Sequence, residues 1–157
     1  MNDAGFVLRA LGARDLDRAA QLHGAAFATL GEPAWTRQDV AELLASPGVA
    51  GLLLEAGGRE VGVALCRVAA DDSELLTIAV SPTHQRRGAG RRLLMAVIDR
   101  VRATGARALF LEVGADNPAA RALYEAVGFQ AIGTRAAYYR RGEGPPADAI
   151  AMRLTLG

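Results

Sequence analysis

The sequence contains no lysine, so all 18 of its basic side chains are arginines. A lysine nucleophile or Schiff base is therefore excluded. The sequence also has only one cysteine, Cys66, which excludes an internal disulfide and is expected to occupy a buried strand position. With two distant histidines, His23 and His84, it offers too few ligands for a structural zinc site, and we expect no metal.

Long apolar runs and a strong net charge are also missing. The longest uncharged apolar stretches, such as residues 49–54 and 75–80, fall far short of the roughly 20 residues that a membrane helix needs. No basic segment followed by a long apolar one, typical of a secretion signal, opens the sequence. The net charge of +1 gives no general reason for nucleic-acid binding. We therefore expect a cytoplasmic protein that binds neither a membrane nor nucleic acid directly.

The 157 residues are 51% hydrophobic, and no turn-rich stretch divides them, so we expect one domain over residues 1–157. Apolar periodicity and turn residues predict strands at 6–11, 49–55, 60–68, 74–80, 108–113, 129–134 and 149–156. They predict helices at 16–30, from Thr36 through Ala45, between "SPTHQRRGAG" and Gly105, and from Asn117 to Gly128. Residues 135–148 are expected to be irregular.

The order of these elements predicts the fold class. Three strands from residue 49 to residue 80 form an antiparallel meander. A helix separates the last of them from the strand at 108–113, and such a crossover implies parallel pairing. We therefore predict an α/β (α+β) protein with a mixed, mostly antiparallel central sheet that is flanked by about four helices.

The stretch "HQRRGAGRRLL", residues 84–94, carries four arginines and two glycines before an apolar helix pattern. Cations at a helix N-terminus are disfavoured by a few tenths to about 1 kcal/mol each, so the arrangement suggests a bound anion. A P-loop would need a lysine, a dinucleotide fingerprint would need a third glycine at Leu93, and a nucleic-acid patch would have aromatic residues between the arginines. A solvated basic helix start is the remaining alternative.

The segment "QRRGAG" resembles the pyrophosphate-binding segment Q/R-x-x-G-x-G/A of the GCN5-related N-acetyltransferases. Three segments, "ELLTIAVSPTHQRRGAGRRLL", "LFLEVGADNPAARALYEAVGF" and "RAAYYRRGEGPPADAIAMRL", together resemble the RimI-type ribosomal-protein alanine N-acetyltransferases. The resemblance implies the GNAT fold, with a V-shaped split between the fourth and fifth strands. It also implies acetyl-CoA as the donor, direct attack by the acceptor amine and no acyl-enzyme.

The resemblance also assigns site residues. Glu112 would be the general base and Tyr124 the general acid. The residues that would bind acetyl-CoA are Ile78, Ala79 and Val80 through their backbone, Arg86, Arg87, Gly88, Ala89, Gly90 and Arg91 around the pyrophosphate, and Asn117 beside the pantetheine arm. Taken without the resemblance, the residues favour a plainer interpretation, in which Glu112 is a solvated strand-end carboxylate and Tyr124 is an amphipathic helix residue with its hydroxyl at the surface. A module that only binds acyl-CoA would need neither of them.

The implied acceptor is the N-terminal alanine of a small-subunit ribosomal protein. An α-amino group is roughly a quarter neutral near pH 7.4, whereas a lysine is only about 0.1% neutral, so a single base favours the former. Acidic side chains at Asp71, Asp72, Glu74 and Glu143 either attract a basic peptide or are simply solvated. Another amine, such as a small molecule, another protein N-terminus or an aminoacyl-tRNA, remains an alternative, and we expect a monomer or weak dimer.

Two features bear on the acceptor side without identifying it. Tyr138 and Tyr139 either help to hold the peptide or cover the edge of the core. Gly114 stands where the family usually carries arginine after "LEV". This glycine predicts a more flexible and less positive loop beside Glu112.

Overall fold

The computed structural model describes residues 5–157, so the start of the N-terminal segment considered above lies outside the described residues. These residues form one seven-stranded sheet in the order β1-β2-β3-β4-β5-β7-β6. The strands are β1 (Phe6–Ala10), β2 (Val49–Ala56), β3 (Arg59–Ala69), β4 (Asp72–Val80), β5 (Ala108–Gly114), β6 (Gln130–Arg141) and β7 (Gly144–Thr155). The α-helices are α1 (Leu16–Phe27), α2 (Arg37–Ala45), α3 (Ala89–Ala103) and α4 (Pro118–Val127). Short 3-10 turns are η1 (Ala13–Asp15), η2 (Ala28–Leu30) and η3 (Pro82–His84). The predicted fold class is confirmed.

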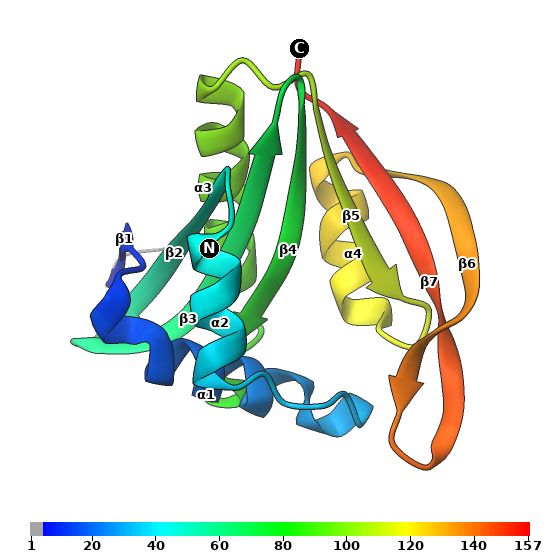
Figure 1. Ribbon diagram of the computed structural model, residues 1–157, viewed down its shortest axis with the longest axis horizontal. Coiled ribbons are helices and arrows are strands. Elements are labelled where there is room, and N and C mark those ends of the chain that lie inside the picture. The colour runs from blue at the N-terminus through cyan, green and yellow to red at the C-terminus, as the bar shows by residue number, and fades with distance from the viewer. Residues whose placement is uncertain (1–4) are drawn as a thin grey trace.

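The helices cover both faces of the sheet (Figure 1). Helices α1 and α2 pack on one face against side chains such as Leu53 and Val63. Helix α3 packs on the other face against Leu54 and Ala64, the next residues along the same strands. Because alternate side chains of β2 and β3 enter different cores, these strands are apolar nearly throughout. The single cysteine, Cys66, is buried as predicted.

Local sequence sets the start of α2 and both ends of α4. The Thr36 hydroxyl accepts from the backbone N–H of Asp39, whose carboxylate accepts in turn from the N–H of Thr36, and this capping box starts α2. Asn117 caps α4 ahead of Pro118, and Gly128 ends it in the left-handed conformation, at φ 117°. Within residues 5–157, no helix is long and apolar enough to span a bilayer.

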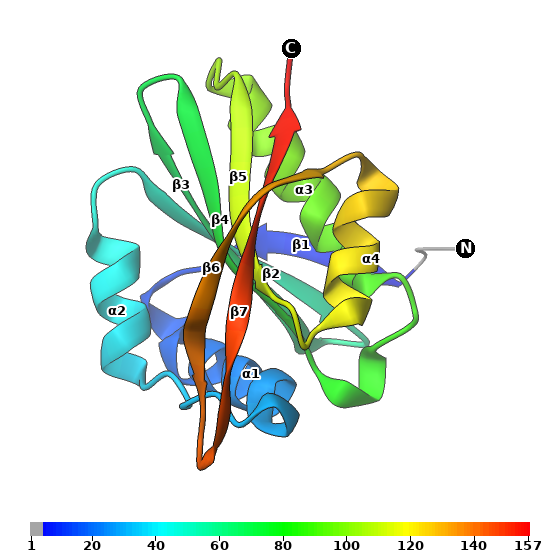
Figure 2. The same cartoon turned by 90° about the vertical axis from the view of Figure 1, so that its right-hand side faces the viewer.

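The prediction that residues 135–148 are irregular is wrong, because β6 and β7 continue through them as a long twisted hairpin (Figure 2). Three register shifts interrupt the pairing, and Ala137 adopts a positive φ of 51° with its N–H bound by the Asp148 carboxylate. Such bulges break the two-residue alternation that identifies a strand in sequence. Pro145 and Pro146 precede Ala149, in the part of β7 that does not pair with β5 and therefore needs fewer backbone N–H donors.

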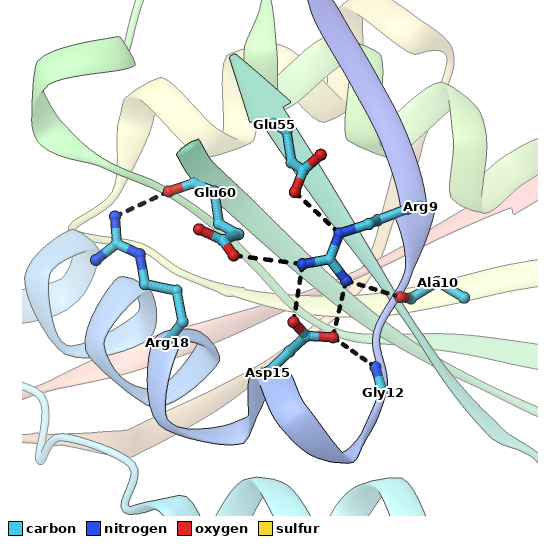
Figure 3. A network of polar contacts seen from close by, with 7 residues as sticks. All are labelled: Arg9, Ala10, Gly12, Asp15, Arg18, Glu55 and Glu60. Carbon is cyan, nitrogen blue, oxygen red and sulfur yellow. Dashed lines mark hydrogen bonds and ion pairs between the residues drawn. The ribbon is translucent and has the colours of Figure 1, made fainter. Parts of the chain in front are cut away.

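A polar network joins β1 to the start of α1 and to the β2–β3 hairpin (Figure 3). The Arg9 guanidinium donates to both carboxylate oxygens of Asp15, at 2.8 and 2.9 Å, and to Glu55 at 2.9 Å. It also contacts Glu60 at 3.3 Å. The edge strand is therefore attached through charge pairs as well as through its ladder with β2.

Candidate active site

The sheet splits between its two parallel strands. Strands β4 and β5 pair only from Asp72 to Glu74 against Ala108 to Phe110, and beyond these residues they diverge (Figure 1). The predicted split lies where expected. Two cavities lie along this split. We call them the arginine cavity, which includes Arg86 and Arg91, and the tyrosine cavity, which includes Tyr138 and Tyr139.

The arginine cavity has a volume of about 440 Å³. Of the residues predicted to bind acetyl-CoA, those that line it are Ile78, Ala79, Val80, Arg86, Gly88, Gly90, Arg91 and Asn117. Two others do not line it: Arg87 is an exposed residue of the same loop, and Ala89 is only 1% exposed within the core. Ala89 is the first residue of α3, and its side chain packs in the hydrophobic core.

The loop before α3 is shaped to hold an anion. Gly88 is the N-cap residue, at φ 85°, and among the described residues no side chain caps this helix. Its first-turn N–H groups are therefore available, with the positive end of the helix dipole behind them. Arg86 adopts a positive φ of 63°, an uncommon conformation for a residue with a side chain. Such local strain recurs at binding sites, and here it accompanies two guanidinium groups on one cavity.

The tyrosine cavity has a volume of about 270 Å³ and includes Glu112 and Tyr124. Glu112 is half-buried on β5, between the inward-facing Leu111 and Val113. Its Oε1 lies 3.4 Å from Arg135 Nη2, while its Oε2 is buried and makes no hydrogen bond among residues 5–157. This carboxylate oxygen has unused capacity to accept a proton or a hydrogen bond.

Tyr124 lines both cavities. It is 5% exposed and stands edge-on to Phe129 at a centroid distance of 5.7 Å. Burial raises the pKa of its hydroxyl well above the usual range, so the group stays protonated at neutral pH. The alternative of a solvated surface tyrosine is wrong, because α4 turns this residue toward the split rather than toward water.

Gly114 gives the loop beside Glu112 no charge of its own at that position, but a positive charge reaches this loop from β6. The guanidinium of Arg141, at the end of β6, donates to Asp116 through Nε at 2.8 Å and through Nη2 at 3.1 Å. A β-carbon on Gly114 would lie 2.7 Å from Arg141 Nη2, so the absent side chain leaves room for this guanidinium. Sequence reasoning missed the pair because Arg141 lies in the segment expected to be irregular.

Helix α1 and the segment after it also line the tyrosine cavity. His23, Glu32 and Trp35 line it, and His23 stacks on Trp35 at 4.0 Å. His23 is buried. Burial lowers its pKa to about 4 and raises the pKa of Glu32. Asn117 lines both cavities, but its side-chain oxygen already caps α4 by accepting from Ala120 at 3.3 Å.

Comparison with known proteins agrees with this geometry. Residues 16–129 match the Acetyltransferase (GNAT) family. The N-alpha-acetyltransferase RimI of Mycobacterium tuberculosis is 40% identical over 152 residues, which cover 94% of this chain and 91% of that protein. The [Ribosomal protein bS18]-alanine N-acetyltransferase of Salmonella typhimurium is 44% identical over 105 residues, which cover 67% of this chain and 70% of that protein.

Solved structures lead to the same assignment. The crystal structure of the ribosomal-protein-S18-alanine N-acetyltransferase from Escherichia coli has a TM-score of 0.87 and 34% identity. The alignment covers 97% of this chain and 94% of that one. The chain therefore belongs to the acetyltransferase (GNAT) family.

Proposed function

We propose that this enzyme transfers an acetyl group from acetyl-CoA to the N-terminal α-amino group of a protein, most specifically to the N-terminal alanine of a small-subunit ribosomal protein. The observation that carries the proposal is the meeting of the two cavities at Tyr124, with Glu112 on the wall of the tyrosine cavity. The name of the M. tuberculosis relative supports N-alpha-acetyl transfer, and the name of the S. typhimurium relative supports alanine of ribosomal protein bS18 as the acceptor.

The arginine cavity fits the chemistry of acetyl-CoA. Arg86, Arg91 and the free N–H groups of α3 would bind the pyrophosphate. Apolar side chains of Phe27, Ile78 and Leu123 line the same cavity and suit the pantetheine arm. Acetyl-CoA supplies a thioester carbonyl that an amine can attack.

Glu112 and Tyr124 would carry out the proton transfers. Glu112 accepts a proton from the acceptor ammonium, directly or through water, and leaves a neutral amine to attack the thioester carbon. As the carbon–sulfur bond breaks, the attacking nitrogen loses its second proton to water, Tyr124 donates its proton to the sulfur, and Glu112 later returns its proton to solvent. Because burial raises the pKa of this tyrosine, it releases the proton only as charge develops on the leaving sulfur and then recovers one from solvent.

The tyrosine cavity suits a cationic acceptor. Three of its lining residues, Glu32, Glu74 and Glu112, carry carboxylates, and its one arginine is bonded to Asp116. A small amine would find the same carboxylates, so charge alone does not choose between a peptide and a polyamine. Tyr138, Tyr139 and Arg141 of β6 line the same cavity and would contact a peptide that continues beyond its first residue.

A comparison of three candidate acceptors tests this function. The purified protein is incubated with acetyl-CoA and a peptide that begins Ala-Arg, with the same peptide blocked at its N-terminus, or with a polyamine, while free thiol is followed. Turnover of the unblocked peptide alone is expected. Turnover of the blocked peptide, or of the polyamine only, would sink the proposal, and acetyl-CoA binding without any turnover would favour a regulatory binding module.

We further propose that residues 1–157 act as one catalytic domain in the cytoplasm, as a monomer or weak dimer. The single sheet through residues 5–157 supports the first part. Light scattering at micromolar concentration tests the last.

A further inference from the structure

Arg141 connects three separate segments around the tyrosine cavity. It ends β6, its side chain is only 9% exposed, and it binds Asp116 on the β5–α4 turn through two hydrogen bonds. Its guanidinium lies over the Tyr139 ring, 4.8 Å from the centroid. Its Nη1 faces Glu32, on the segment after α1, at 3.8 Å. Glu32, Tyr139 and Arg141 all line the cavity.

Two glycines on different segments make room for Arg141. A β-carbon on Gly114 would come within 2.5 Å of Asp116 Oδ1 and 2.7 Å of Arg141 Nη2. A β-carbon on Gly31 would lie 3.2 Å from the backbone carbon of Arg141, and Gly31 has a φ of 68°. The chain thus leaves space on both sides of one residue, at the place where the hairpin meets the other two walls.

We propose that Arg141 is a positioning residue for the acceptor: it holds the hairpin, the β5–α4 turn and the segment carrying Glu32 in the arrangement that receives the acceptor chain. This inference rests on the proposed function, since it concerns how the same site takes its amine substrate. It gives Gly114 a role as well, because a side chain there would displace the guanidinium.

A role confined to hairpin stability explains less of the geometry. Removing a guanidinium from water is costly, and a surface hairpin can be stabilised by its own ladder. Arg141 instead donates two hydrogen bonds to Asp116 on the β5–α4 turn. Its Nη1 is buried and makes no hydrogen bond among the described residues. This arrangement restrains the cavity walls relative to one another.

The first test needs no substrate. Trp35 is the only tryptophan of the chain and lines the same cavity, near Glu32 along the chain. In Arg141→Ala, the fluorescence of Trp35 should shift to longer wavelength and become more accessible to acrylamide. Arg140→Ala is the matched control, because it removes the same charge from the neighbouring, exposed position of the hairpin. An emission spectrum equal to that of the control would overturn the proposal.

The second test is kinetic. Arg141→Ala should raise KM for an N-terminal-alanine peptide by roughly ten- to a hundredfold, as expected when substrate-positioning groups shift by about an ångström. The change in kcat should be smaller, and the Kd for acetyl-CoA should stay at the wild-type value. Arg141→Lys, which keeps the charge but loses the bidentate geometry, should recover only part of the loss. A lower Tm with an unchanged peptide KM would mean that Arg141 contributes only to stability, and it would refute the inference.

Gly114→Ala disturbs the contacts of Arg141 without replacing Arg141 itself. The atoms that it would strike are the ends of flexible side chains, so the fold should persist while the pair between Arg141 and Asp116 is displaced. It should raise the peptide KM in the wild-type background and add little in the Arg141→Ala background. Full additivity of the two substitutions would contradict the proposed contact.

The two tests separate the inference from the proposed function. If the wild-type protein leaves the peptide unmodified, the proposed function fails, and the fluorescence of Trp35 alone then decides whether Arg141 restrains the cavity walls. If the wild-type protein acetylates the peptide and the Arg141 variants do so with unchanged KM, the function stands and the inference fails.

Discussion

Burial decides what the tyrosines of this protein can do. Tyr124 is 5% exposed and Tyr138 is 51% exposed, although both line the same cavity. Burial, and then the charge of Glu112, raises the pKa of Tyr139 to about 12. Both hydroxyls therefore stay protonated at neutral pH, and only Tyr124 also lines the arginine cavity.

Replacing either proposed proton-transfer group should slow transfer without weakening donor binding. We expect Glu112→Gln and Tyr124→Phe each to lower kcat by at least about 100-fold, because each removes one proton-transfer step. The Kd for acetyl-CoA, measured by calorimetry, should be unchanged. Glu125→Gln is the control, since it alters an exposed carboxylate next to Tyr124 on α4. Normal turnover by both variants would refute the mechanism.

His23 should make stability depend on pH in mildly acidic solution. It is 2% exposed, and burial lowers its pKa from 6.5 to about 4, so between these values only the unfolded chain binds the proton. Its contribution is fully present above pH 6.5 and is lost as pH falls toward 4, by about 3 kcal/mol in all. His23→Phe keeps a ring against Trp35 and should lose less stability over this range in urea titrations. An identical pH dependence in the two proteins would exclude this role.

At the scale of elements, the helices follow local rules and the last hairpin does not. Caps such as Thr36 and Gly128 act within one turn, so their residue types predict where α2 and α4 end. The β6–β7 hairpin depends on bulges that are stabilised from the opposite strand, as when Asp148 binds the N–H of Ala137. No short-range signal in the sequence reports such a contact.

The start of α3 should lose affinity for acetyl-CoA when its arginines are removed. Arg86→Ala and Arg91→Ala should each raise Kd by roughly tenfold, because each loses a charge-assisted contact beside the helix N-terminus. The loss should shrink at high salt, which screens exposed charges. Arg100→Ala, at the other end of the same helix, should bind like wild type. Unchanged affinity in the first two variants would mean that this loop is only a solvated basic turn.

At the scale of the whole molecule, distant segments are connected by two charge networks. Arg141 joins the walls of the tyrosine cavity, and Arg9 joins the first strand to α1 and to the β2–β3 hairpin. Each network has one guanidinium facing carboxylates from segments far apart in sequence. Neither arginine stands out by composition or spacing from the other 16.

Removing Arg9 should destabilise the fold. Arg9→Ala leaves Asp15, which is buried, and two further carboxylates without their cation, and it should cost roughly 1–3 kcal/mol in a partly exposed network. Arg9 lowers the pKa of Asp15, so this stability is present above about pH 4 and is lost as the pH falls further. Thermal unfolding of wild type, Arg9→Ala and the control Arg59→Ala at pH 7 and pH 3 measures it. A deficit that grows toward pH 3 would contradict this account.

The sequence by itself determined the order of the elements, the ends of α2 and α4, the parallel pairing of β4 with β5 and the helix start beside Arg86 and Arg91. Capping and spacing act over one or a few turns, and the crossover follows from the order of the elements along the chain, so all of them can be predicted from residue types and their positions. Only the tertiary structure decided that Arg141 fills the space beside Gly114 and that His23, Glu32 and Trp35 line one cavity with Glu112. Contacts between segments this far apart in the chain depend on how both faces of the sheet are packed, and residue spacing carries no record of that packing.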